Sequence, residues 1–239
     1  MEGRRDQSIQ IRLDRVSLEI EGVRILKNVN LTIEKGSSYL LVGRNGSGKT
    51  SLLRVMAGLI SPTSGKIFID DREVKDVLEL RSVTGYIFQN PQTQVIGCTV
   101  EEDVAFGLEN LGLDREVMKK RVEEVLKEVE LLELRCEEPI TLSGGQLQRL
   151  AIASVIALEP SFLLLDEPLS MLDERSKEDV LSLLKKFHRS KGLVVATHDI
   201  EHYDFCDYVI YMDNGEAKLF EIHEFFSVER EEVFRPSWA

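Results

Sequence analysis

Apolar and polar residues alternate along the N-terminal part of the chain. The alternation begins at Ile9, Ile11 and Leu13 and continues to Ile33, with one interruption at Glu21-Gly22. A period of two predicts antiparallel strands with one buried face each, joined here by a turn. Residues 61–71 add a turn cluster, a short strand and a second turn, so we expect a small β-rich layer.

Three later runs are apolar without alternation, at Tyr39–Val42, Phe162–Leu165 and Leu193–Ala196. Parallel strands in the centre of an α/β sheet are buried on both faces, so these runs predict central strands. Helical patterns alternate with them, which predicts an α/β fold. The other expected elements are helices at 51–57, 147–158 and 174–189, a helix after Thr197-His198-Asp199, a strand at 85–88 and a hairpin at 208–220 with its turn at 213–215.

Between residues 95 and 158 the pattern is helical. Thr99 followed by Glu102 has the spacing of a capping box, which starts a helix. Apolar residues then recur at helical spacing between charged residues. The sequence therefore predicts an inserted helical subdomain over about residues 95–158, with apolar positions at Val117, Val122, Val125, Leu126, Val129 and Leu132.

Composition and charge narrow the class of protein. The chain has 239 residues, enough for one large domain or a domain with a subdomain, and a formal net charge of −12. That charge argues against nucleic acid or an anionic lipid surface as the main partner, because either attracts clustered lysine and arginine. Cys98, Cys136 and Cys206 lack metal-ligand spacing, which predicts reduced thiols in a cytosolic protein. No apolar stretch follows residues 1–6 and no run of about eighteen apolar residues occurs, so we expect neither a signal peptide nor a membrane span.

The run Gly43–Thr50 lies directly after the apolar run at 39–42 and before the helix expected at 51–57. It matches the pattern G-x-x-x-x-G-K-[ST], in which backbone N–H groups surround phosphates, a lysine reaches them and a hydroxyl holds Mg²⁺. The strand before it and the helix after it favour this interpretation over a chance glycine-rich turn. The predicted nucleotide site comprises Gly43, Arg44, Asn45, Gly46, Ser47, Gly48, Lys49, Thr50 and Ser51.

Two acids, Asp166 and Glu167, follow the apolar run at 162–165. Open α/β sheets bind ligands at the carboxyl ends of their strands, so Asp166 is suited to Mg²⁺ and Glu167 to orienting or deprotonating water. Adjacent acids at a strand end can also be solvated turn residues. The phosphate loop in the same chain favours the chemical interpretation.

A third candidate is the pentapeptide LSGGQ at residues 142–146. Ser143 and Gln146 have capping-box spacing, while Gly144 and Gly145 leave the first N–H groups of the helix uncovered, as in an anion site. Taken alone, this pentapeptide is equally compatible with an ordinary helix start. Its meaning depends on the motifs around it.

Together these motifs resemble the ATP-binding cassette ATPases. The phosphate loop, Gln89 after a strand, the LSGGQ run, the two acids, the loop 170–173 and His198 occur in the family's order across about residues 9–220. The resemblance implies a P-loop NTPase fold: an α/β protein with a RecA-like mixed sheet core, an N-terminal antiparallel β-subdomain and an inserted α-helical signature subdomain. It also implies an ATPase domain at 1–220, followed by a short tail at 221–239 that is a candidate dimer contact.

The family's mechanism assigns roles within one chain. Lys49 and the loop N–H groups hold the phosphates of ATP, while Thr50, Asp166 and Gln89 surround Mg²⁺. Glu167 activates water and His198 contacts the γ-phosphate. A lone histidine is more often a structural or surface residue, but the position of His198 just past an apolar strand favours the catalytic role.

Other assignments reach beyond one chain or depart from the family pattern. In this family Ser143, Gly145 and Gln146 act across a dimer interface on the ATP of a partner cassette, and Gly144 and Asp173 belong to the same nucleotide-binding set. The family usually stacks an aromatic ring on adenine, and Ile20 occupies the matching position. An aliphatic face at adenine would affect nucleotide affinity or base preference.

The run 89–110 is similar to the cobalt and energy-coupling-factor branch of importer ATPases. It reads QNPQTQ at 89–94 and TVEEDVAFGLEN at 99–110. In that branch these runs line the groove that receives the coupling helices of a transmembrane subunit. We expect Glu101, Glu102 and Asp103 to receive basic residues of those helices. The alternative for 99–110 is a capped helix without this role.

The resemblance therefore implies an ATPase that energises import of a vitamin or a transition-metal ion from the cytoplasmic face of the membrane. Its cofactors would be ATP and Mg²⁺. Its partners would be a second cassette, alike or different, a transmembrane coupling subunit at about Gln89–Asn110 and, indirectly, a substrate-binding membrane subunit. The alternative is a soluble ABC ATPase in a non-transport assembly or regulatory complex.

Overall fold

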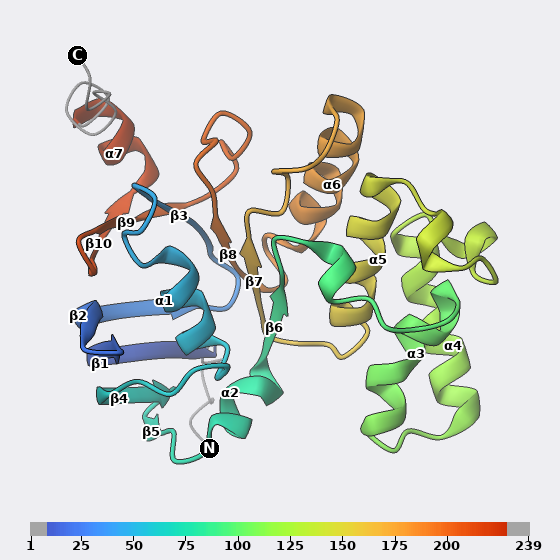
Figure 1. Ribbon diagram of the computed structural model, residues 1–239, viewed down its shortest axis with the longest axis horizontal. Coiled ribbons are helices and arrows are strands. Elements are labelled where there is room, and N and C mark those ends of the chain that lie inside the picture. Colours follow the sequence, from blue (N-terminus) through green and yellow to red (C-terminus); the bar gives the residue numbers. More distant parts are fainter. Residues whose placement is uncertain (1–8, 229–239) are drawn as a thin grey trace, which may run out of the picture.

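Residues 9–228 are described by a computed structural model, and they form two sheets with helices between and beside them (Figure 1). The smaller sheet is antiparallel in the order β2-β1-β4-β5. The predicted turn at Glu21-Gly22 is confirmed, with positive φ at both residues as a tight hairpin requires. The strands of this sheet are β1 (Gln10–Ile20), β2 (Val23–Glu34), β4 (Ser64–Ile69) and β5 (Arg72–Glu73).

The larger sheet is mixed, in the order β10-β9-β3-β8-β7-β6. Strands β6, β7, β8, β3 and β9 pair in parallel, and β10 closes one edge in the antiparallel sense. The predicted α/β class with a mixed core sheet is confirmed. Its strands are β3 (Ser38–Gly43), β6 (Thr84–Ile87), β7 (Phe162–Asp166), β8 (Gly192–Ala196), β9 (Tyr208–Asp213) and β10 (Glu216–Glu221).

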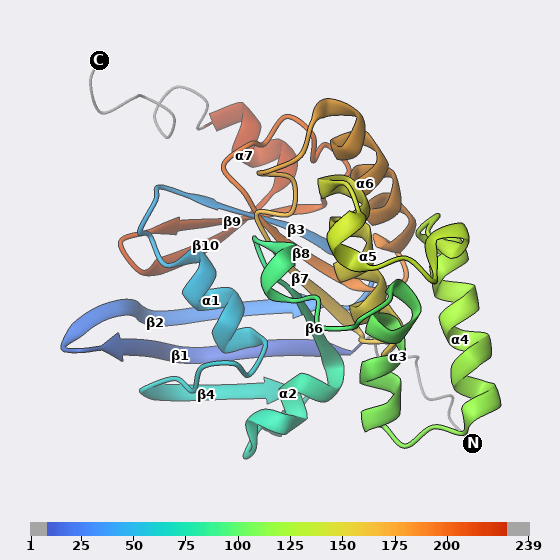
Figure 2. The ribbon, with the colours of Figure 1, turned by 45° about the vertical axis from the view of Figure 1, so that its right-hand side comes forward.

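The mixed sheet separates two hydrophobic cores. In β3, Tyr39 and Leu41 join the core shared with the antiparallel sheet, while Leu40 and Val42 join the core under the helices of the other face. This two-sided burial explains why the run at 39–42 has no polar alternation. Figure 2 shows α1 (Lys49–Met56) between the two sheets, and α2 (Val77–Val83) follows β5.

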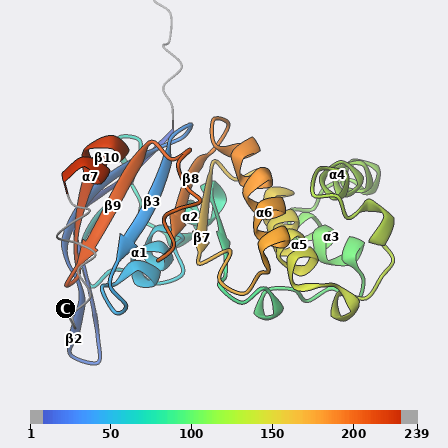
Figure 3. The same ribbon diagram turned by 90° about the horizontal axis from the view of Figure 1, so that it is seen from above.

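The other face of the mixed sheet carries α5 (Gly144–Ile156) and α6 (Glu174–Phe187), and α3 (Val100–Asn110) and α4 (Arg115–Glu128) lie beyond them. Figure 3 shows this order from the sheet outwards. The predicted capping box starts α3, where the Thr99 hydroxyl accepts a hydrogen bond from the Glu102 N–H. Short 3-10 turns at 91–93, 132–134 and 139–141 connect the helices.

The prediction of a helix after Thr197-His198-Asp199 is wrong, because residues 197–207 form turns. The Asp199 N–H donates to the Thr197 hydroxyl at 3.0 Å. Two turn hydrogen bonds follow, each between residues three apart: Tyr203 N–H donates to Ile200 C=O, and Cys206 N–H donates to Tyr203 C=O. Local side-chain bonds of this kind compete with helix formation, and burial of Tyr203 and Cys206 holds the turns in place.

The chain continues past the hairpin β9–β10 into a short helix, α7 (Ile222–Val228). Phe225 of α7 is buried against the mixed sheet, so the packed part of the chain extends beyond residue 220. Residues 229–239 lie outside the described part. The division at 220 and the role of the tail as a dimer contact stay predictions.

Candidate functional site

The phosphate loop connects β3 to α1 and presents unpaired donors. Gly48 caps α1 without a side-chain hydrogen bond, so the first N–H groups of this helix have no side-chain acceptor. The Ser47 hydroxyl is buried and makes no hydrogen bond within residues 9–228. Donors of this kind at a helix N-terminus fit an anionic phosphate.

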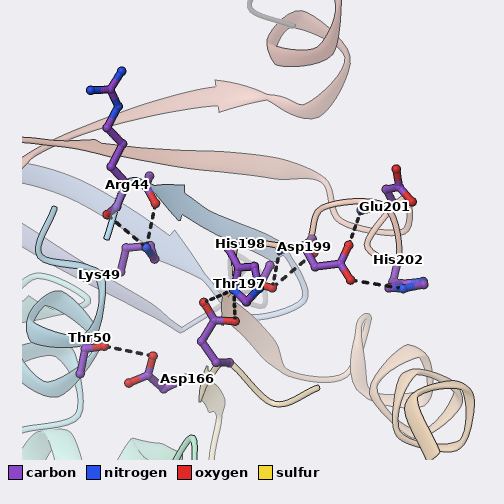
Figure 4. Close-up of polar contacts among 11 residues, drawn as sticks. Arg44, Lys49, Thr50, Asp166, Thr197, His198, Asp199, Glu201 and His202 are labelled. Atoms are coloured by element: carbon purple, nitrogen blue, oxygen red, sulfur yellow. Dashed lines mark hydrogen bonds and ion pairs between the residues drawn. The ribbon is translucent and has the colours of Figure 1, made fainter. Parts of the chain in front are cut away.

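Lys49, the first residue of α1, lies across the loop. Its ammonium group donates to the carbonyl oxygens of Gly43 at 2.8 Å and Arg44 at 3.4 Å. Burial lowers the pKa of Lys49, and the charges of Glu167 and Asp166 oppose this shift. In Figure 4 the Arg44 side chain extends away from Lys49, so Lys49 is the cation held over the loop.

Asp166, at the end of β7, is linked to the helix after the loop. Thr50 donates its hydroxyl to one carboxylate oxygen of Asp166 at 3.1 Å (Figure 4). The other oxygen accepts a hydrogen bond from the Tyr86 hydroxyl at 3.0 Å. Asp166 is only 5% exposed. The structure thus brings together two of the three residues predicted for Mg²⁺, Thr50 and Asp166, from distant parts of the sequence, and adds a tyrosine that the sequence did not indicate.

Glu167 and His198 meet beside this pair. Glu167 has a positive φ of 49°, and its N–H donates to Ala196 C=O at 2.8 Å. This backbone conformation is uncommon for a residue other than glycine and is frequent at functional sites. The His198 Nδ1 lies 3.0 Å from the Glu167 carboxylate. Gln89 lies exposed just past β6, and among residues 9–228 no hydrogen bond joins it to these groups.

The LSGGQ run starts α5 with the predicted capping box. Ser143 N–H donates to the Gln146 side chain at 2.8 Å, and Gln146 N–H donates to the Ser143 hydroxyl at 3.3 Å. A Cβ on Gly145 would lie 2.4 Å from the Ser176 hydroxyl, so glycine is needed for the start of α5 to approach the start of α6. Asp173 caps α6 by accepting from the Ser176 N–H and hydroxyl, which lowers its pKa.

The start of α5 is not next to the phosphate loop of the same chain. Figures 1 and 3 show the loop on the α1 side of β7 and β8, and α5 on the opposite side. Ile20, at the end of β1, is 44% exposed, and the structure shows no aromatic residue there. The described chain therefore assembles Lys49, Thr50, Asp166, Glu167 and His198, and holds residues 143–146 elsewhere.

A turn that joins β9 to β10 supports the phosphate loop from outside. Gly215 N–H donates to Ser47 C=O at 3.1 Å, and Lys27 N–H donates to Gly215 C=O at 2.8 Å. The Asp213-Asn214-Gly215 turn is evident from the sequence. Its contact with residue 47 is not, because no sequence pattern reports which turn packs on which loop.

The segment 89–110 is tied to α5 by two side chains. Gln94 accepts from Phe88 N–H at 3.0 Å and donates to Ala151 C=O at 3.1 Å. Asp103 accepts from the N–H groups of Ile96 and Gly97 and from the Ser154 hydroxyl, at 2.7, 2.9 and 2.6 Å. Because its carboxylate is buried and already bonded, the prediction that Asp103 receives basic residues of a partner is wrong.

An apolar groove lies between this segment and the loop before α5. It has a volume of ≈ 480 Å³ and is lined by residues 92 and 95–98 on one side and 138–140, 142 and 147 on the other. Ile96 and Ile140 are 62% and 88% exposed. Glu101 and Glu102 are exposed on the first turn of α3, where they line a separate depression between α3 and α4. Exposed large apolar side chains in a groove indicate an interaction surface.

Comparison with known proteins decides the family. Residues 26–170 match the sequence model of the family described as ABC transporter. The chain belongs to the ABC transporter family. As an ABC ATPase it binds and hydrolyses ATP, which fits the phosphate loop and the acids at the end of β7.

Relatives place this ABC ATPase among energy-coupling-factor proteins. It is 46% identical over 224 residues to the energy-coupling factor transporter ATP-binding protein EcfA1 of Thermotoga maritima, covering 93% of this chain and 85% of that protein. EcfA1 of Caldanaerobacter subterraneus is 43% identical over 200 residues, covering 82% of this chain and 72% of the relative. The predicted resemblance to this branch is confirmed.

Solved structures agree with the fold of this ABC ATPase. One is cbiO1 of Clostridium perfringens, described as part of the ABC transporter complex cbiONQ, with a TM-score of 0.82 and 31% identity over 91% of this chain and 90% of that chain. Another is the cassette MJ0796 in a dimeric post-hydrolysis state bound to ADP and Pi, with a TM-score of 0.78 and 33% identity over 88% of this chain and 98% of that chain. The predicted cassette fold is confirmed.

Proposed function

We propose that the chain is the ATP-binding and hydrolysing subunit of an energy-coupling-factor importer for a vitamin or a transition-metal ion. The observation that carries the ATPase part is the meeting of the phosphate loop, Asp166, Glu167 and His198 at the ends of β3, β8 and β7, which are neighbours in the sheet. The importer part rests on the named relatives and on the groove beside α3.

Within one chain, the phosphates of ATP bind to the loop N–H groups from Gly43 to Ser51 and to Lys49. Thr50, Asp166 and Gln89 supply hard oxygen ligands of the kind that Mg²⁺ prefers. The ion, when bound, neutralises charge on the phosphates. Glu167 orients and deprotonates the attacking water, and its 3.0 Å contact with His198 supports the paired placement of these side chains at the γ-phosphate.

The second half of each site comes from another cassette. Ser143, Gly144, Gly145 and Gln146 at the start of α5 bind the partner's ATP through uncovered N–H groups and the serine hydroxyl. Ser176 packs against Gly145 and donates its hydroxyl to Asp173, so Asp173 belongs to the same face of the chain as residues 143–146. Ile20 packs against adenine through an aliphatic surface. Binding of ATP by two cassettes at once stabilises their dimer, and hydrolysis releases it.

The membrane role depends on partners. Among the described residues, no helix combines the length and the apolar character that crossing a bilayer requires. We infer that a transmembrane coupling subunit inserts into the groove beside Gln89–Asn110, on the cytoplasmic face, with Glu101 and Glu102 receiving its basic residues. The substrate-binding membrane subunit contacts this chain only through the coupling subunit.

The test is reconstitution with the membrane coupling subunit from the same organism. We expect this subunit to be recovered with the chain. When every cassette of the complex carries Glu167→Gln, the rate of ATP hydrolysis should fall by about 10³-fold or more, because the base is lost. Glu216→Gln, an exposed change on β10, is the matched control. Recovery with soluble partners only would favour the soluble ATPase instead, and full turnover by Glu167→Gln would refute the assignment of the base.

The same preparation tests the docking surface. Glu101→Lys reverses an exposed charge on the first turn of α3 and should lower recovery of the coupling subunit. Glu178→Lys reverses an exposed charge on α6 and serves as the control. Equal recovery with both variants would remove Glu101 from the contact.

A further inference from the structure

Tyr86, on β6, lies beneath the predicted magnesium ligand Asp166. We propose that Tyr86 is a positioning residue that orients the Asp166 carboxylate toward the Mg²⁺ that accompanies ATP. The inference rests on the proposed ATP site. It concerns a residue outside every motif that identifies the family in this sequence.

Three elements meet at the Asp166 carboxylate. Strands β6 and β7 are neighbours, with Tyr86 paired in register to Leu164, two residues before Asp166. The Tyr86 hydroxyl donates to one carboxylate oxygen at 3.0 Å, and Thr50 of α1 donates to the other at 3.1 Å. With one donor on each oxygen, rotation of the carboxylate about its Cβ–Cγ bond breaks both hydrogen bonds.

The environment of Tyr86 holds this donor in one position. The ring is almost completely buried and packs edge-on against Phe88, with 4.9 Å between the ring centroids. An ionised carboxylate only accepts hydrogen bonds, so the Tyr86 hydroxyl is the donor in its 3.0 Å contact with Asp166.

A neutral donor is suited to a metal ligand. A lysine or arginine at this position would orient the carboxylate but would also compensate the charge that attracts the cation. The phenol fixes the geometry and adds no charge of its own to Asp166, while the cation Arg54 interacts with the phenol. Outer partners of this kind typically contribute 10–100-fold to metal affinity.

The experiment is Tyr86→Phe in the full chain, which keeps the ring and its contact with Phe88 and removes only the hydroxyl. Binding of a fluorescent, non-hydrolysable ATP analogue is measured first in EDTA and then across a Mg²⁺ titration. We expect affinity without metal to change by less than about twofold, and the Mg²⁺ concentration for half-maximal effect to rise by about 10–100-fold. Mn²⁺, which binds such sites more tightly, should reduce the difference between variant and parent.

Tyr39→Phe is the matched control. Tyr39 is also a buried tyrosine of the mixed sheet, 3% exposed, and its hydroxyl accepts a hydrogen bond from Glu34 N–H at 2.9 Å. The structure shows no bond between Tyr39 and Asp166, so this variant should keep the Mg²⁺ midpoint of the parent.

The outcomes separate the inference from the proposed function. A Tyr86→Phe midpoint equal to that of the parent overturns the inference and leaves the ATP site standing. Equal loss of analogue binding with and without Mg²⁺ also overturns it, because the hydroxyl would then support the loop and not the metal ligand. If the affinity of the parent protein for the analogue did not change with Mg²⁺ concentration, the proposed metal site itself would be contradicted, and the inference with it.

Discussion

At the scale of single residues, Asp103 and Glu101 lie two positions apart on α3 but in opposite environments. Two residues turn a helix by about 200°, so one side chain points to α5 and the other to solvent. Asp103 accepts three hydrogen bonds that join residues 96 and 97 to Ser154. Glu101 is exposed in the depression between α3 and α4. The same kind of side chain is thus a structural link in one case and a candidate partner contact in the other.

Asp103→Ala should destabilise the isolated chain. The change leaves two partly buried N–H groups without their acceptor, while the Ser154 hydroxyl keeps its hydrogen bond to Leu150 C=O at 3.1 Å. An unpaired buried donor costs about 1–3 kcal/mol, so we expect the free energy of unfolding to fall by about 2 kcal/mol. Glu101→Ala should change it by less than about 0.5 kcal/mol. Urea denaturation of both variants measures the difference. Equal effects would show that the three bonds contribute nothing beyond helix propensity.

At the scale of elements, local patterns predicted what local forces determine. The buried strands follow from four consecutive apolar residues, and the capping boxes at Thr99 and Ser143 from residues three apart. The bond from Tyr86 to Asp166 depends on which strands are neighbours, which no local pattern reports. The helix wrongly expected after Asp199 is the converse case, where turns and burial of Tyr203 determine the backbone.

The β9–β10 turn is an element whose position matters for the site. Its Gly215 has a φ of 85°, and a Cβ there would lie 2.5 Å from the carbonyl oxygen of Ile25. The same residue is bonded to Ser47 in the phosphate loop and to Lys27 in β2. A side chain at 215 therefore has to move a turn on which the loop rests.

We expect Gly215→Ala to weaken ATP binding. If moving the turn weakens ATP binding by about 1 kcal/mol, the affinity for ATP falls ~5-fold. Gly112→Ala is the control: its φ is 67°, but a Cβ there meets nothing within 4 Å, so it has backbone strain without a clash near the loop. Both variants should lose about 1–2 kcal/mol of stability, and only Gly215→Ala should lose affinity. Displacement of a fluorescent nucleotide, with a thermal melt alongside, measures both quantities. A similar loss of affinity in both variants would mean that the turn does not support the loop.

At the scale of the whole molecule, the two nucleotide-binding motifs lie apart. The phosphate loop is beside α1, and the start of α5 lies across β7 and β8 from it (Figure 1). Under the proposed function, a single chain therefore presents two incomplete halves of an ATP site on its surface. Two such chains can complete each other if each supplies the start of α5 to the other's phosphate loop, which makes the ATP-bound dimer the complete form of the enzyme.

Ser143→Arg should separate binding from dimerisation. The arginine replaces the residue that caps α5 and places a bulky side chain on the face that we assign to the partner's ATP, far from this chain's own Lys49. In a Glu167→Gln background, which prevents hydrolysis, we expect ATP affinity of the monomer to stay within about twofold, whereas the ATP-dependent dimer seen by size-exclusion chromatography is lost. Lys49→Ala should lose ATP binding itself, and Ser82→Arg, an exposed change on α2, should alter neither property. If Ser143→Arg weakened monomer binding as much as Lys49→Ala, residues 143–146 would act on the ATP of their own chain. The composite site would then be wrong.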